Sequence, residues 1–138
     1  MTEQRRIAFT VRGTPVAQGS MRAPRAGVVL HDNRSLISWR NTIGWAAKEA
    51  MLGSEMFAGA VSVEAHFRLE RPSSVSREAR EYPTVRKNDI DKLTRALLDA
   101  LSGIAFVDDG HVCDLTVTRR YDDFHEGPGV DVVVEELR

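Results

Sequence analysis

The sequence predicts an α/β (α+β) fold, a small mixed β-sheet of about four strands with two main helices in the order β-α-β-α-β-β. Apolar and polar residues alternate over 61–70, which is the period of a half-buried strand. Apolar residues recur at helical spacing over 36–50 and again over 90–101. The chain has 138 residues, of which 42% are hydrophobic, so we expect a single domain over residues 1–138.

The first half of the chain contains a strand, a loop and a helix in this prediction. Ile7, Phe9 and Val11 alternate with their neighbours and predict the first strand. Residues 13–33 are rich in Gly, Pro, Ser and Arg, which favours a loop or hairpin over a helix. The first helix is then expected to begin at Ser35 as its N-cap and to stop at Gly53.

The second half begins with a basic loop. Residues 71–87 hold two prolines, three serines and five cationic residues without an apolar period. The helix over 90–101 ends at Gly103, and a short strand-like run over 104–107 leads to an Asp-Asp-Gly turn. The β-branched segments 112–121 and 130–136 predict the last two strands, with Cys113 as a small core side chain.

Composition excludes several classes of protein. No apolar run approaches the roughly 18 residues of a membrane-spanning helix, so no membrane partner is expected. Residues 1–12 lack the apolar run of a secretory signal. A single cysteine excludes an internal disulfide and a zinc site of several thiolates. The expected location is therefore a reducing cytoplasm.

Charge is divided unevenly along the chain. Residues 1–88 hold 14 Lys+Arg and 8 Asp+Glu, a net charge of +6, whereas residues 89–138 hold 5 and 12, a net charge of −7. An acidic partner could bind the first part if a metal neutralised the carboxylates of the second. A uniform surface of ion pairs would give the same total, so composition leaves both interpretations open.

Four aspartates flank the second predicted helix: Asp89, Asp91, Asp108 and Asp109. If the chain is extended through Asp89 and helical from about Asp91, these two carboxylates can converge. A return of the chain over 104–107 would bring Asp108 or Asp109 beside them. Three carboxylates at one point repel unless a hard cation such as Mg²⁺ lies among them.

A structural interpretation of the same residues is also available. Aspartate commonly caps or begins a helix, and Asp-Asp-Gly is a common turn. Arg95, one turn after Asp91, could form an ion pair worth about 0.2–0.5 kcal/mol or could bind a scissile phosphate. Spacing alone favours the structural roles, whereas the basic loop that leads directly to Asp89 favours the chemical one.

The segment KNDIDKLTRALLDAL at 87–101, followed by FVDD at 106–109, resembles the RusA-type Holliday-junction resolvases. These are small endodeoxyribonucleases common in phages and prophages. The family pattern is a Lys-Pro-Asp-x-Asp-Asn-Leu start, a lysine one turn later, an Asp-Ala-Leu end and an Asp-Asp pair before the next strand. The resemblance is specific over 87–112, and the segment GTPVAQGS at 13–20 is also similar to the family.

The resemblance implies a metal-dependent site. Asp89, Asp91 and Asp109 take the positions of the catalytic aspartates, and Asp108 is a less certain ligand. The family's catalytic lysine falls on Arg95, which keeps the positive charge but cannot accept a proton. The implied cofactor is Mg²⁺, with Mn²⁺ as a substitute, which lowers the pKa of a bound water for phosphodiester hydrolysis.

The resemblance also implies a homodimer that binds branched DNA, because symmetric nicks in a four-way junction need two sites related by two-fold symmetry. The implied function is Holliday-junction resolution in DNA recombination and repair. The alternatives are a non-catalytic DNA-junction-binding module of the same fold and a small α/β interaction protein. The candidate phosphate contacts are cations of the two loops and of the second helix: Arg22, Arg25, Arg71, Arg77, Arg80, Arg86, Lys87 and Lys92.

Overall fold

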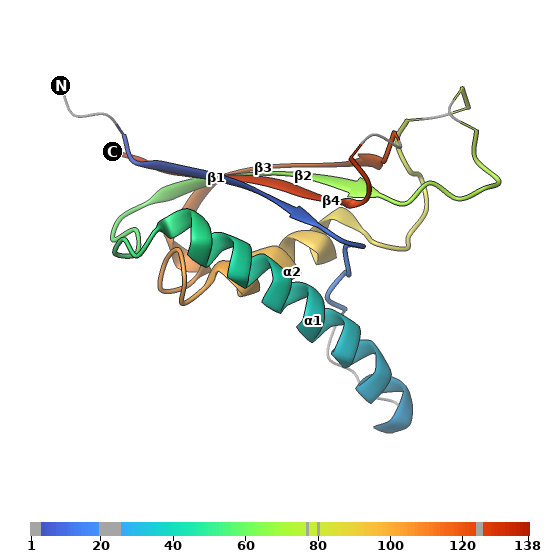
Figure 1. The fold of residues 1–138 in the computed structure, drawn as a ribbon, viewed down its shortest axis with the longest axis horizontal. Helices are drawn as coiled ribbons and strands as arrows, with labels where there is room; N and C mark the ends of the chain where they lie inside the picture. The colour runs from blue at the N-terminus through green and yellow to red at the C-terminus, as the bar shows by residue number, and fades with distance from the viewer. Residues whose placement is uncertain (1–3, 20–25, 77, 80, 124–125) are drawn as a thin grey trace.

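A computed structural model describes residues 4–19, 26–76, 78–79, 81–123 and 126–138. The elements in order are β1 (Arg6–Arg12), α1 (Ala26–Met51), β2 (Val61–Leu69), α2 (Ile90–Leu101), the 3₁₀ turn η1 (Asp109–His111), β3 (Val112–Tyr121) and β4 (Gly129–Glu136). The predicted α+β class and the order β-α-β-α-β-β are confirmed. Both helices lie on one face of the sheet (Figure 1). Neither helix, as far as it is described, is long and apolar enough to cross a membrane.

The sheet is mixed, with the strand order β1-β4-β2-β3. β4 is antiparallel to both of its neighbours, whereas β2 and β3 are parallel. Parallel neighbours need a crossover connection, and α2 is that connection. β3 therefore begins beside Val61, at the start of β2, and ends beside Leu69. Consequently α2 runs from the end of β2 back to the end of the sheet where β3 begins (Figure 1).

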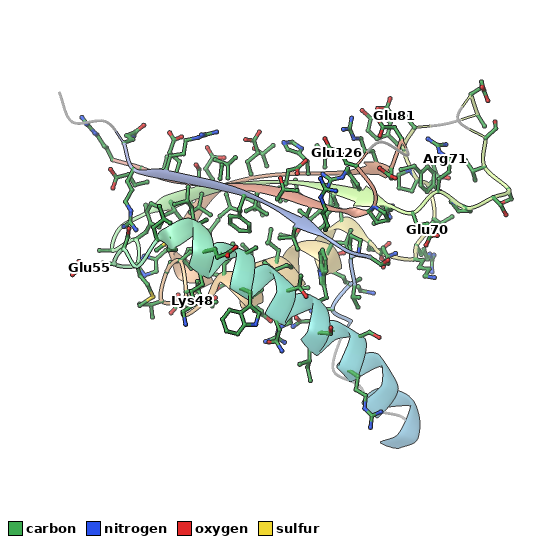
Figure 2. All side chains as sticks on the ribbon, viewed as in Figure 1. Lys48, Glu55, Glu70, Arg71, Glu81 and Glu126 are labelled. Carbon is green, nitrogen blue, oxygen red and sulfur yellow. The ribbon has the colours of Figure 1, made fainter. Side chains whose placement is uncertain are left out.

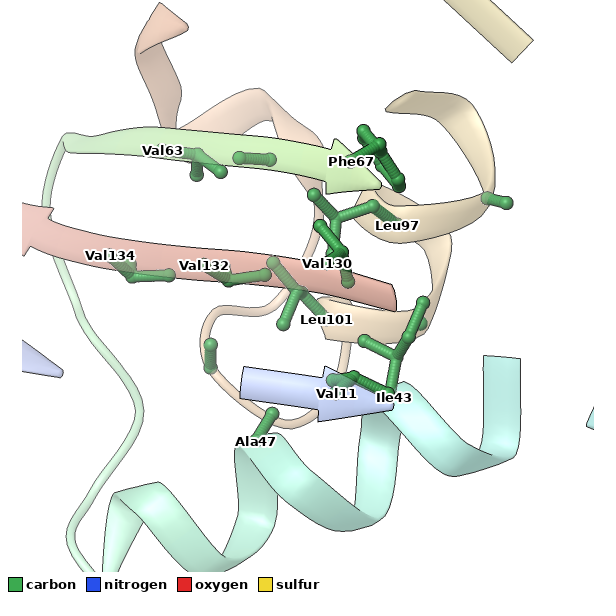
Figure 3. Packing of buried hydrophobic residues seen from close by; sticks show 14 of the residues in the cluster. Val11, Ile43, Ala47, Val63, Phe67, Leu97, Leu101, Val130, Val132 and Val134 are labelled. Carbon is green, nitrogen blue, oxygen red and sulfur yellow. The ribbon is translucent and has the colours of Figure 1, made fainter. Parts of the chain in front are cut away.

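The core lies between the sheet and the helices. Every second residue of β2 and β4 faces the helices, and Phe67, Val130, Val132 and Val134 are fully buried there. Figure 3 shows these side chains packed against the apolar stripes of both helices, which include Ile43, Ala47, Leu97 and Leu101. The apolar residues at helical spacing and those at strand spacing therefore form one continuous cluster.

Three local expectations prove wrong. Helix α1 begins at Ala26 and so includes residues assigned to a loop, because 26–34 holds no proline and only one glycine; Ser35 is then inside the helix. Residues 104–107 form tight turns, with Gly103 N–H donating to the Phe106 carbonyl at 2.7 Å. Cys113 is exposed, because it lies on the edge strand β3 where the helices do not cover the sheet.

The other face of the sheet is polar, and no helix in the described part of the chain covers it (Figure 2). One row across this face consists of Thr10, Asp131, His66 and Thr118, contributed by β1, β4, β2 and β3. The Thr10 hydroxyl donates to Asp131 Oδ1 at 2.8 Å, and His66 Nδ1 lies 2.6 Å from Thr118 Oγ1. These bonds cross-link neighbouring strands by their side chains.

Arg68 is a buried cation on this polar face. Its side chain is 3% exposed, and Nη1 lies 2.6 Å from Asp131 Oδ2 and 3.4 Å from Glu126 Oε2. Nε donates to the Gly127 carbonyl at 2.9 Å. A Cβ at Gly129 would lie 2.8 Å from Arg68 Nη2 and would collide with the Val11 carbonyl, so glycine is required where this guanidinium crosses β4.

We predict that Asp131→Asn destabilises the fold in a pH-dependent way. Burial acts to raise the pKa of Asp131, but hydrogen bonds from Thr10 and Arg68, with the charge of Arg68, outweigh it and lower the pKa. A lowered pKa stabilises the fold above the unfolded value of about 3.9, and this contribution is lost as pH falls through the folded pKa. At pH 7 the substitution is expected to cost about 1 kcal/mol, because Asp131 is partly exposed.

Urea denaturation at pH 7 and at steps down to pH 2 measures this effect. The difference in free energy of unfolding between wild type and Asp131→Asn should shrink below about pH 4. Glu55→Gln, which changes an exposed carboxylate, is the matched control and should differ little from wild type at every pH. A constant difference between wild type and Asp131→Asn would contradict the assignment.

Candidate functional site

Asp89 and Asp91 both lie at the start of α2, the first as its N-cap residue and the second in its first turn. As predicted, the chain is extended at Asp89 (φ −54°, ψ 144°) and helical from Ile90. The Asp89 carbonyl accepts from Leu93 N–H at 3.0 Å, but the Asp89 carboxylate makes no capping hydrogen bond. Asp91 is exposed in the first helical turn. The capping role that could have explained Asp89 is therefore not performed by its side chain.

The segment before Asp89 is held in place by Arg119 of β3. Arg119 Nη1 donates to the Asn88 carbonyl at 2.8 Å and to the Lys87 carbonyl at 3.2 Å, and Nη2 donates to the Val85 carbonyl at 3.1 Å. Asn88 itself has φ 60°, a left-handed conformation that asparagine tolerates better than most residues. Together these features fix the direction in which the chain enters α2.

Sequence reasoning assigned no role to Arg119. The signal was present, because Arg119 is the one cation on the helix-facing side of β3, among Leu115, Val117 and Tyr121. A cation in that row needs polar partners beneath the sheet. Only the tertiary structure identifies these partners, because one of them, the Asn88 carbonyl, lies 31 residues earlier in the chain.

The loop between β1 and α1 packs against α2. Gln18 N–H donates to the Lys92 carbonyl at 3.0 Å, and Gln18 Nε2 donates to Asp99 Oδ2 at 2.7 Å. These bonds place the segment 13–19 along the helix that carries Asp91. They also account for Asp99, whose carboxylate positions this loop.

Arg95 lies one turn after Asp91 on the same side of α2, and its side chain is exposed. None of the ion pairs among the described residues joins Arg95 to Asp91. The local ion pair considered for Arg95 is thus not formed.

An open cleft of about 1080 Å³ lies next to the start of α2. Lys87 and Asn88 line it, together with Arg71 from the loop that follows β2. Lys87 and Arg86 are exposed and Lys92 is half-buried, so cationic side chains border the approach to Asp89.

Arg71 also stabilises its own loop. Its guanidinium lies 5.2 Å from the centroid of the Tyr121 ring, and Nη1 donates to the Ser76 carbonyl at 2.9 Å. Figure 2 shows Arg71 near Glu70 at this end of the sheet. The other predicted phosphate contacts lie outside the described residues: Arg22, Arg25, Arg77 and Arg80.

Asp108 and Asp109 lie at the other end of α2. Asp108 Oδ1 accepts from Gly110 N–H at 2.8 Å and so caps the turn η1, which is the structural role considered for it. Asp109 is exposed. β3 begins directly after this turn, whereas Asn88 is held by Arg119 near the far end of β3. The two acidic pairs are therefore separated by the length of α2, about 18 Å for 12 residues.

The expected return of the chain toward Asp89 is therefore wrong for a single chain. The parallel pairing of β2 and β3 requires the chain to start β3 at the opposite end of the sheet. Accordingly, the described residues contain no group of three His, Cys, Asp or Glu side chains that could hold a metal. Asp89 and Asp91 still suit Mg²⁺, which is often bound by one or two carboxylates with water and phosphate oxygens.

Comparison with known proteins identifies a similar protein and a matching family. The chain is similar to the protein described as "Uncharacterized protein YqaN" of Bacillus subtilis (strain 168), with 29% identity over 141 residues, 95% of this chain and 96% of the relative. Residues 12–135 match the family described as "Endodeoxyribonuclease RusA". This match includes both acidic pairs, Arg95 and the whole of α2, and the chain therefore belongs to the RusA endodeoxyribonuclease family.

Proposed function

We propose that the protein is a Mg²⁺-dependent endodeoxyribonuclease that resolves four-way DNA junctions by paired symmetric nicks, as a homodimer, in recombination and repair. The observation that supports this proposal is the start of α2, where Asp89 and Asp91 are two residues apart and directly follow Lys87 and Asn88, which line an open cleft. Neither carboxylate is used to cap the helix or to pair with Arg95. Family membership supplies the chemistry, which is cleavage of DNA.

Asp89 and Asp91 would hold Mg²⁺, with Mn²⁺ as a substitute. When bound, such an ion lowers the pKa of a water and neutralises charge on the phosphate. Arg95 would donate hydrogen bonds to phosphate oxygens as negative charge develops, and it cannot act as a base. Lys87, Arg86 and Lys92 would bind the DNA backbone on either side, which makes affinity depend on salt.

In a homodimer, Asp109 of one copy would join the site at the start of α2 of the other copy. Within one chain Asp109 is a helix length from Asp89 and Asp91, but the exposed Asp109 of a second copy is free of that constraint. Each site would then contain Asp89 and Asp91 of one copy and Asp109 of the other. Two such sites are related by two-fold symmetry, as opposed nicks in a junction require.

We predict that Asp91→Asn removes cleavage but not binding. Loss of a metal ligand is expected to slow hydrolysis by about 10³-fold or more, because several kcal/mol of transition-state stabilisation depend on the ion. Binding should persist or tighten, since one negative charge near the phosphates is gone. Single-turnover cleavage of a labelled junction with Mg²⁺, and gel shifts in EDTA, measure the two quantities. Glu55→Gln is the control, and cleavage at the wild-type rate by Asp91→Asn would contradict the proposal.

Arg95 offers a second test at the same site. Arg95→Ala is expected to lower the single-turnover rate by about 10²-fold, and Arg95→Lys by much less, because a lysine also stabilises phosphate charge. A pH–rate profile distinguishes this role from that of a base. The profile of Arg95→Ala should keep the shape of the wild-type profile, and loss of a basic limb would contradict the assignment.

Mixing two inactive chains tests whether the site is shared. Asp91→Asn and Asp109→Asn are each expected to be inactive. In a mixed dimer one site is intact if Asp109 acts on the other copy's Asp91, so refolding the two variants together should restore nicking at one strand. If every site is made by one chain, no mixture recovers activity.

The alternative functions give different results. Junction-specific binding without cleavage in any divalent metal would favour the non-catalytic binding module. Junction affinity no greater than that for a linear duplex at moderate salt would favour the interaction protein.

A further inference from the structure

We propose that Trp45, exposed on α1, is a stacking site for an unpaired base of single-stranded DNA, with Arg40 and Lys48 binding the phosphates beside it. The inference rests on the proposed action on branched DNA for its ligand, and it adds a DNA contact at the end of α2, away from the carboxylates at its start. Proteins that hold single strands without sequence preference combine aromatic rings, on which bases stack, with neighbouring cations.

The two tryptophans of α1 differ in burial. Trp39 is 4% exposed and belongs to the core, whereas Trp45 is 69% exposed. Six residues of α-helix turn the side-chain direction by about 240°, so the two rings lie on different faces of α1. Tryptophan is highly buried on average in folded proteins. The core is built without Trp45, and its indole is therefore available to a ligand.

Trp45 lines a cleft of about 600 Å³ between α1 and the end of α2. Gly44, Ala100 and Ile104 line the same cleft. A Cβ at Gly44 would lie only 3.1 Å from Ile104 Cδ1, so α1 and the turn after α2 approach closely there. The volume lies within the range of about 300–1,000 Å³ that is typical of small-molecule sites, and it is sufficient for a nucleobase with its sugar.

Cations border this cleft. Lys48 Nζ lies 5.7 Å from the centroid of the Trp45 ring, within the range of a cation–π contact, and Arg40 lines the same cleft. Neither cation belongs to any of the ion pairs among the described residues. Positive charge beside an aromatic ring matches a DNA strand, in which each base is joined to a phosphate. A purely apolar partner would bury these charges without compensation, which is unfavourable.

Two polar side chains of the cleft suit the edge of a base. The Asn41 amide can both donate and accept hydrogen bonds, whereas the Asp99 carboxylate accepts them. Asp99 Oδ2 accepts from Gln18 Nε2 at 2.7 Å, and this bond holds the carboxylate in place. A carboxylate in this position suits the amino group of cytosine, adenine or guanine, which thymine lacks. A cytosine oligonucleotide is therefore the probe of choice.

Tryptophan fluorescence tests the contact without any cleavage. The full chain is titrated in EDTA at neutral pH with a cytosine oligonucleotide of about 12 nucleotides. Emission of Trp45 should be quenched, and the remaining emission should shift toward the shorter wavelengths of the buried Trp39. Trp45→Phe, which keeps only the buried tryptophan, should show no quenching. Unchanged emission of the wild type at saturating oligonucleotide would overturn the proposal.

Fluorescence anisotropy of the labelled oligonucleotide gives the affinities. Trp45→Ala should weaken binding by about tenfold or more, and Trp45→Phe by much less, because a phenyl ring also stacks on a base. Lys48→Gln should weaken binding and make it less dependent on salt. Ile37→Ala is the matched control, because Ile37 is 53% exposed on the same helix but does not line the cleft. Equal affinity of wild type and Trp45→Ala would show that the site is wrong.

Other occupants of the cleft give different results. Free deoxycytidine monophosphate should quench Trp45 only at much higher nucleotide concentration than the oligonucleotide does, because it lacks the neighbouring phosphates. Quenching by both at the same nucleotide concentration would overturn the assignment to a strand. If Trp45→Ala changes the self-association of the chain in sedimentation equilibrium but not its affinity for the oligonucleotide, the face is a protein contact and the proposal is wrong.

The outcomes separate this inference from the proposed function. Junction cleavage with Mg²⁺ by a chain whose Trp45 does not respond to the oligonucleotide overturns the stacking site and leaves the nuclease proposal standing. A response of Trp45 without cleavage of any junction in any divalent metal supports the stacking site and overturns the nuclease.

Discussion

The parallel pairing of β2 with β3 is the constraint on which the rest of the structure depends. Parallel neighbours cannot be joined by a tight turn, so the chain must travel back along the sheet, and α2 performs this crossing. Whatever precedes α2 and whatever follows it are therefore held a helix length apart. Asp89 and Asp91 lie before this crossing and Asp108 and Asp109 lie after it, so the described part of one chain does not bring three of these carboxylates together.

The start of α2 is built by contacts from distant parts of the chain. Arg119 fixes the entering segment from β3, Gln18 fixes the loop from β1, and Asn88 supplies a left-handed residue at the bend. These contacts hold the start of α2 in place, and the Asp89 carboxylate makes no capping hydrogen bond there. A carboxylate that is positioned by its surroundings, rather than by its own hydrogen bonds, can bind a cation without weakening the fold.

The two edges of the sheet differ in how far they are buried, and its two faces differ in polarity. One face of the sheet lies under both helices (Figure 1). On the other face, Arg68 of β2 and Asp131 of β4 form an ion pair. The β1 edge is closed by α1, whereas the β3 edge keeps exposed apolar residues and opposite charges at its two ends.

The sequence by itself determined the order of the helices and strands and the local geometry at Asp89, but not where α1 begins. Alternation over β2 and the apolar stripe of α2 encode burial directly, because each depends only on neighbours within a few residues. The tertiary structure alone decided where Asp109 lies, which carbonyls Arg119 holds and that Cys113 is exposed. These depend on which strands pair and in which direction, and pairing joins residues about 50 positions apart, such as Val61 and Val112, that leave no periodic trace in the sequence.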